Sequence, residues 1–197
     1  MAEKNKIWIA QVSQDAFGLV PQTLNLQNEL ANYGYEVHYV MVSGAHLTLA
    51  RMQSVQLCYK QRFTAMPEAG LEKQKMKILF FDTDMYILND PGEIAKIIKE
   101  ADEKDLNICG NYKKGDNNWI LDENIYKEEI INDNYIYIDP FKYAVPFGFL
   151  YCYIPYSYIF KMTNVGEDIY FTRENPEIKI YLDKRIKLGH LKRVLLK

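Results

Sequence analysis

The sequence predicts a single α/β domain with a mostly parallel central sheet flanked by helices, and three observations carry this prediction. Its 197 residues suit one domain of ordinary size. Through the first 90 residues, apolar runs of buried-strand type alternate with helical patterns, an order that favours parallel strands joined by crossover helices. Two aspartates then follow a buried strand, at the end where such sheets bind ligands.

The first half of the chain contains the clearest elements. Short apolar runs predict strands, because they are bounded by turn residues and are too short for helices. Apolar residues that recur every three or four positions predict helices, and Gly34 suits the end of the first one. The expected strands are residues 7–12, 36–42 and 77–81, and the expected helices are residues 22–33 and 46–63.

The second half is less regular. Asp90 followed by Pro91 predicts the start of a third helix, since aspartate caps helices and proline suits their first position. Residues 111–135 are polar and poorly patterned, which predicts a long loop. The remaining expectations are a strand at 106–110, β structure within 135–153, helices at 155–162 and from 166 onwards, and a last strand at 178–182.

Composition limits the class of protein. Hydrophobic residues make up 48% and charged residues 25%, which is typical of globular chains and not of disordered or fibrous ones. A net charge of -2 gives no overall basic field for nucleic acid or an anionic membrane. The three widely spaced cysteines form no disulfide framework, and we find no membrane-spanning or signal segment, so we expect a cytoplasmic location.

The main chemical signal is the acidic turn, Asp82-Thr83-Asp84, directly after the strand at 77–81. Two carboxylates one residue apart can point into one site, where they repel each other unless a cation lies between them. Oxygen ligands suit Mg²⁺ or Mn²⁺, and these ions commonly bridge to substrate phosphates. An acidic turn that only caps the following structure is the alternative explanation.

The chain resembles a small GT-A glycosyltransferase, similar to the family 2-like enzymes that use nucleotide sugars. The resemblance covers roughly residues 7–192 and depends on five short stretches in the order typical of that family. They are the strand at 7–12 with its polar loop, LARM at 49–52 (like the family's ARN, with Met52 for Asn), LFFDTDM at 79–85 (like LFLDSDM), VPFGFL at 145–150, and GEDIYF at 166–171 together with LGHL at 188–191 (like GEDxxF and the C-terminal GH).

The resemblance implies a metal site and a donor site. It makes Asp84 the direct metal ligand and gives Asp82 a contact to the ribose or to the metal and its waters. His190 would complete the metal site, and an imidazole ligand favours Mn²⁺ over Mg²⁺. Arg51 could reach the nucleotide or its phosphates. The donor would be a UDP- or GDP-sugar bound by residues 1–90.

The resemblance also implies an acceptor half at residues 91–197. Asp168 matches the base that takes the proton from the acceptor hydroxyl, and Glu167 would assist it or orient the acceptor. Such a base implies inversion at the anomeric carbon. Residues 179–197 hold seven Lys or Arg against one acid, which indicates a solvated tail or a surface for an anionic acceptor, nucleic acid included.

Three other functions stay open. A binding module for nucleotides or sugars would keep the acidic turn without catalysis. A nucleotidyltransferase normally needs a Gly-rich basic loop near the first strand, and the sequence has none there. A phosphatase of the haloacid-dehalogenase type would use the first aspartate as nucleophile, but it requires Thr where this chain has Tyr86.

Overall fold

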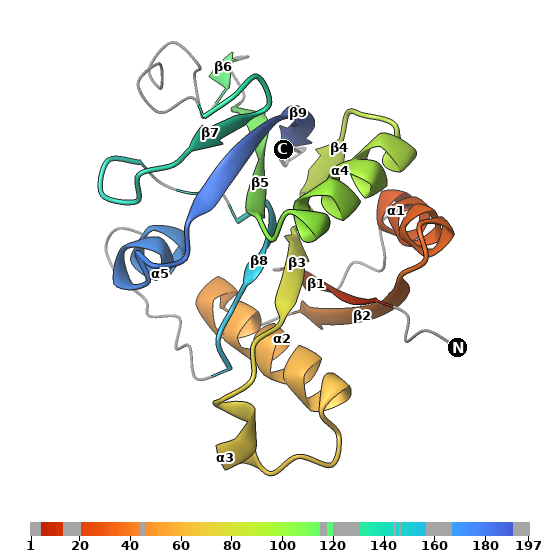
Figure 1. The fold of residues 1–197 in the computed structure, drawn as a ribbon, viewed down its shortest axis with the longest axis vertical. Coiled ribbons are helices and arrows are strands. Elements are labelled where there is room, and N and C mark those ends of the chain that lie inside the picture. Colours follow the sequence, from red (N-terminus) through yellow and green to blue (C-terminus); the bar gives the residue numbers. More distant parts are fainter. Residues whose placement is uncertain are drawn as a thin grey trace, which may run out of the picture.

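One mixed sheet of nine strands runs through the part of the chain that is described (Figure 1). The computed structural model describes residues 5–13, 21–43, 46–114, 118–119, 131–143, 145, 147–156 and 167–190. The strand order is β2-β1-β3-β8-β5-β9-β4, with β6 paired to β5 and β7 paired to β9. The sheet therefore takes strands from both halves of the sequence.

The five elements expected between residues 7 and 81 form as the sequence predicts. The elements are β1 (Lys6–Ser13), α1 (Pro21–Asn32), β2 (Glu36–Ser43), α2 (Leu47–Arg62) and β3 (Lys77–Phe81). β1 lies between β2 and β3 and is parallel to both, so Trp8 pairs with His38 on one side and with Ile78 on the other. This confirms the expected order of strand, helix, strand, helix, strand.

The remaining elements complete the fold. They are α3 (Glu68–Leu71), β4 (Met85–Ile87), α4 (Pro91–Glu103), β5 (Asn107–Lys114), β6 (Asn118–Trp119), β7 (Tyr135–Tyr137), β8 (Phe149–Tyr153), α5 (Glu167–Glu174) and β9 (Ile180–His190). The predicted cap is confirmed, because the Asp90 side chain accepts a hydrogen bond from the Gly92 N–H at 2.9 Å.

The α/β class is confirmed, but the sheet is mixed rather than mostly parallel. Only three of the eight described strand pairs are parallel: β1 with β2, β1 with β3, and β5 with β9. The physical reason is that β8 enters antiparallel between β3 and β5, while β4 and β7 add antiparallel to β9. Antiparallel neighbours, unlike parallel ones, do not require a crossover helix between them.

Several boundaries differ from the prediction. α3 and β4 were not predicted, and β5 extends into the expected loop as far as Lys114. The last strand begins at Ile180 and reaches His190, well beyond the expected end at 182. Most of the helix expected at 155–162 lies outside the described residues, and so does the end of the basic segment from 191 onwards.

Two hydrophobic cores lie on opposite faces of the sheet. On one face, α1 and α4 lie side by side (Figure 1) and bury Leu30 and Ile94 against Phe81. On the other face, α2 and α5 bury Val55 and Phe171 with Phe80 and its neighbours. Successive strand residues point to opposite faces, so Phe80 and Phe81 supply one large ring to each core.

Arg185 ties β9 to its neighbours through a polar network. Its guanidinium donates to both carboxylate oxygens of Asp183, which is fully buried, and to Glu100 on α4 at 2.7 Å and the Tyr135 hydroxyl at 3.2 Å. The hydrogen bond from Arg185 lowers the pKa of Glu100. The middle of the basic segment is therefore a structural strand rather than a solvated tail.

Candidate functional site

The acidic turn is anchored where β1 and β3 end. The Asp82 N–H donates to the Gly148 carbonyl at 3.0 Å, and the Thr83 N–H donates to the Val12 carbonyl at 3.4 Å. The turn closes on itself, because the Met85 N–H donates to the Asp82 carbonyl at 3.1 Å. The backbone of the turn is thus fixed against two strands, which leaves Asp84 exposed at its tip.

Gly148 makes room for this anchoring. A Cβ at this position would lie 3.0–3.1 Å from three side-chain atoms of Met85, which is tighter than ordinary packing. A glycine lets the backbone that precedes β8 approach the turn closely enough to accept the hydrogen bond from Asp82. The VPFGFL stretch therefore contributes to the acidic turn itself as well as to the strand that follows.

Arg51 and Asp82 form a salt bridge beneath the turn. Arg51 Nη2 donates to Asp82 Oδ2 at 2.8 Å, and the side chains are 2% and 17% exposed. The guanidinium lies over two aromatic rings, 5.0 Å from the centre of Phe147 and 5.7 Å from that of Phe80. The sequence predicted Arg51 for phosphate contact, but it did not predict Asp82 as its partner.

An aromatic chain links this pair to α5. The Phe171 ring packs edge-on against the Phe147 ring, with 5.3 Å between centres and 89° between planes. Asp168 is half-buried in the first turn of α5, and its Oδ1 accepts a hydrogen bond from the Ile169 N–H at 2.8 Å. Glu167 begins the helix, but its side chain lies outside the described residues.

The strand register brings His190 to the turn. β4 and β9 are antiparallel with Met85 opposite His190, so the backbone of His190 lies beside the residue that follows Asp84. The His190 side chain is outside the described part of the structure. Within the described part, no group of three His, Cys, Asp or Glu residues is close enough to hold a metal ion.

Gly189 has a packing role that the sequence did not reveal. It pairs with Tyr86, and a Cβ at Gly189 would lie 1.9 Å from Cζ of the Tyr86 ring. The Tyr86 ring therefore lies over the backbone of Gly189, where there is no side chain. Such a contact fixes the register in which β4 and β9 pair. Because Tyr86 follows Met85, this contact fixes how His190 stands relative to the acidic turn.

This contact gives a first prediction. We expect Gly189→Ala to lower the free energy of unfolding by about 1–3 kcal/mol, because the new methyl group must displace the Tyr86 ring. The double variant with Tyr86→Ala should lose less than the sum of the two single changes. Urea denaturation of all four proteins measures this coupling, and strictly additive losses would show that Tyr86 is not the obstacle.

The three cysteines are buried. Cys58, Cys109 and Cys152 are free thiols, and burial raises the pKa of each. Buried thiols of this kind are poor nucleophiles.

Within the described ranges, no helix has both the length and the apolar character needed to span a membrane.

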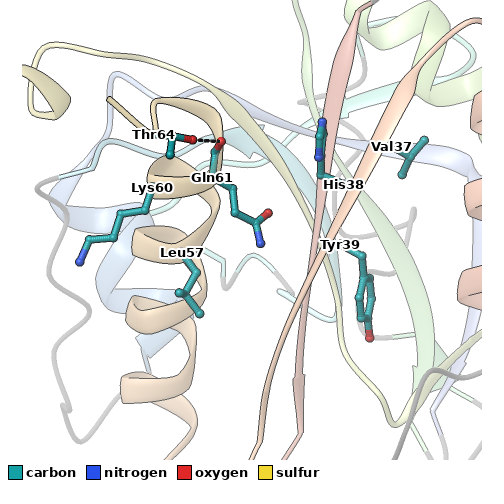
Figure 2. Close-up of a pocket in the computed structure, with 7 residues that line it drawn as sticks. All are labelled: Val37, His38, Tyr39, Leu57, Lys60, Gln61 and Thr64. Atoms are coloured by element: carbon teal, nitrogen blue, oxygen red, sulfur yellow. Dashed lines mark hydrogen bonds between the residues drawn. The ribbon is translucent and has the colours of Figure 1, made fainter. Parts of the chain in front are cut away.

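A shallow hollow lies between β2 and α2, away from the acidic turn. Figure 2 shows Leu57, Lys60 and Gln61 on the second half of α2 and Thr64 just beyond its end, with His38 and its neighbours on β2. Arg51 lies instead in the first half of α2, and Asp82 lies in the turn directly after β3. The hollow therefore does not belong to the site.

The described structure thus joins only part of the predicted site. Asp82 and Arg51 are in direct contact, and Asp84 is exposed in the same turn as Asp82. The pairing of His190 with Met85 places the backbone of His190 next to this turn. Asp168 is on a separate helix that reaches the site through Phe147 and Phe171. Sequence reasoning did not single out either ring, because aromatic residues in an apolar stretch are normally core.

Comparisons with known proteins add a likeness of fold. No protein-family model and no curated protein match the sequence. Eight chains of solved structures match the fold. One is the crystal structure of GalNAc-T7, a GT-A glycosyltransferase, with UDP, GalNAc and Mn²⁺, at a TM-score of 0.48 and 10% identity. That match covers 99% of this chain but only 45% of the other, so this chain spans less than half the length of GalNAc-T7.

Proposed function

We propose that the chain is a metal-dependent glycosyltransferase that moves a sugar from a nucleotide-sugar donor to an acceptor hydroxyl. The observation that carries this proposal is the acidic turn, fixed at the carboxyl ends of β1 and β3 with Asp82 held by Arg51. Ligand sites of α/β sheets lie at such strand ends. The sequence resemblance to nucleotide-sugar enzymes supports the choice of donor.

The residues at the turn fit Mn²⁺ or Mg²⁺. Asp84 is exposed and provides carboxylate oxygen, and His190 can add an imidazole from the paired strand. Oxygen donors suit both ions, and an imidazole shifts the preference toward Mn²⁺. When bound, the ion would offset the charge of the leaving diphosphate as a Lewis acid.

Arg51 acts as a positioning residue in this proposal. A planar guanidinium that is buried against two aromatic rings has little freedom, so it fixes the carboxylate of Asp82 in one orientation. Asp82 can then contact the donor ribose or water molecules around the metal. This role differs from direct phosphate binding, since the Arg51 side chain is only 2% exposed.

Asp168 is proposed as the base for the acceptor hydroxyl. Its position in the first turn of α5, connected to the site by Phe171 and Phe147, supports this assignment. We expect Asp168→Asn to lower transfer at least about 100-fold, within the range of general-base catalysis, with donor binding unchanged. The steady-state rate and the donor affinity together measure this, and full activity would remove Asp168 from the mechanism.

Binding of the donor nucleotide tests the proposal and does not require the acceptor to be identified. A ligand that binds only the folded protein raises the melting temperature according to its affinity. We expect one of the common nucleoside diphosphates to raise it in the presence of Mn²⁺ and to have a much smaller effect in EDTA. The absence of any shift across the set would contradict the proposal.

Turnover separates a transferase from a binding module. With the best base identified, the matching nucleotide sugars are assayed for release of the nucleoside diphosphate. Release that requires Mn²⁺ supports the enzyme. Tight, metal-dependent binding with no release of any donor would favour the non-catalytic module instead.

A further inference from the structure

A second cavity lies where β1 and β3 begin, at the opposite end of these strands from the acidic turn. We call it the basic pocket and define it by Lys6, Trp8, Arg62, Lys75, Lys77 and Asp102, with a volume of about 140 Å³. Lys77 begins β3, whereas the acidic turn follows the end of this strand. Five residues at about 3.3 Å each separate the two by about 16 Å.

The lining of the basic pocket carries an excess of positive charge. It holds four cationic side chains and one carboxylate, and a second carboxylate, that of Asp105, lies 3.2 Å from Lys77. Lys6 is 3.7 Å from Glu36 in a surface pair, which contributes little. Among the described residues, no carboxylate pairs with Arg62 or Lys75. The Arg62 guanidinium instead lies 5.0 Å from the centre of the Trp8 ring.

Lys77 is buried without well-aligned hydrogen bonds. Its side chain is 5% exposed, and its Nζ lies 3.2 Å from Asp105 Oδ1 and 3.6 Å from Asp102 Oδ1. In the described part of the chain, this Nζ has no hydrogen bond of acceptable geometry. Asp102 accepts instead from Tyr35 and Tyr151, at 3.1 and 2.9 Å. The charge of the Lys77 ammonium is thus balanced, but N–H donors of this group remain available to a ligand.

Trp8 adds a second buried donor at the same place. The residue is 1% exposed, its ring stacks on His38 at 4.5 Å, and its Nε1 has no hydrogen-bond partner among the described residues. Buried donors without acceptors are costly, and an oxygen-rich ligand would relieve that cost. Cavities for drug-sized ligands are about 300–1,000 Å³, so the basic pocket suits a smaller molecule.

We propose that the basic pocket binds a small oxyanion the size of inorganic phosphate. Lys75 and Arg62 supply positive charge at its mouth, and Lys77 supplies N–H donors from its buried end. Guanidinium and ammonium groups are the side chains that proteins use for phosphate. The site is separate from the acidic turn and does not depend on the proposed glycosyl transfer.

The test uses the position of Trp8. Trp8 and Trp119 are the two tryptophans of the chain, so Trp119→Phe leaves Trp8 as the remaining indole reporter. This variant is titrated with inorganic phosphate in EDTA at constant ionic strength, and we expect a saturable change in tryptophan fluorescence. Chloride over the same range should give no saturation. An equal response to chloride, or no saturation with phosphate, would overturn the proposal.

Substitutions in the same background locate the response. We expect Lys75→Ala and Arg62→Gln each to weaken phosphate binding at least fivefold. Lys60→Ala is the matched control, because Lys60 is exposed on the same helix as Arg62 but lines the other hollow. Asp84→Ala should also leave binding unchanged. Equal affinity in the pocket variants and the controls would show that the anion binds elsewhere.

Discussion

Asp84→Ala is expected to lower Mn²⁺-dependent turnover of the nucleotide sugar by about 100- to 1,000-fold. The reason is that Asp84 is the exposed carboxylate at the tip of a turn whose backbone is already fixed by Val12 and Gly148. Loss of one preorganised group that stabilises charge costs about 3–4 kcal/mol in the transition state. The free energy of unfolding should hardly change, since substitutions of exposed residues usually alter it by less than about 0.5 kcal/mol.

Two measurements make the Asp84 prediction specific. Calorimetry should show weaker Mn²⁺ binding in Asp84→Ala, and circular dichroism should show an unchanged melting curve in EDTA. Asp133→Ala removes another exposed aspartate, outside the acidic turn, and is expected to retain full activity. Undiminished Mn²⁺-dependent turnover in Asp84→Ala would contradict the metal assignment.

The sequence predicted the parts of the fold that depend on local pattern. β1, β2 and β3 are continuous apolar or half-buried runs, and α1, α2 and α4 repeat apolar residues at helical spacing, so their neighbours along the chain suffice to define them. β4 has only three residues, and its partner lies about a hundred positions further on, at residues 188–190. A strand defined by distant pairing leaves no local signal.

The same distinction applies to the two sites. The acidic turn was predictable, because it needs only two aspartates after a buried strand. The Arg51–Asp82 pair depends on how α2 packs against the sheet. The spacing of residues along the sequence does not reveal how a helix is oriented on a sheet. The basic pocket is formed by residues from separate elements, so its lysines and its arginine look in sequence like ordinary solvated charges.

Arg51→Met is expected to be the most destabilising single change at the site, with a loss of about 2–4 kcal/mol. Removal of one partner of a buried ion pair leaves the other charge poorly compensated, and such losses reach about 3–5 kcal/mol for fully buried pairs. Asp82 is 17% exposed, which allows water to recover part of this cost. Met fills a similar volume against Phe80 and Phe147, so cavity formation contributes little.

Arg62→Met is the matched control for stability, because Arg62 ends the same helix and is exposed. It should cost less than about 1 kcal/mol, whereas Arg51→Met should shift the urea midpoint strongly with little change in slope. Arg51→Lys separates packing from positioning: a lysine keeps the charge but not the planar fork that holds Asp82. We expect it to recover part of the stability while the turnover rate at saturating donor stays at least tenfold low. Full recovery of both quantities would mean that Arg51 acts only as a counter-charge and does not orient Asp82.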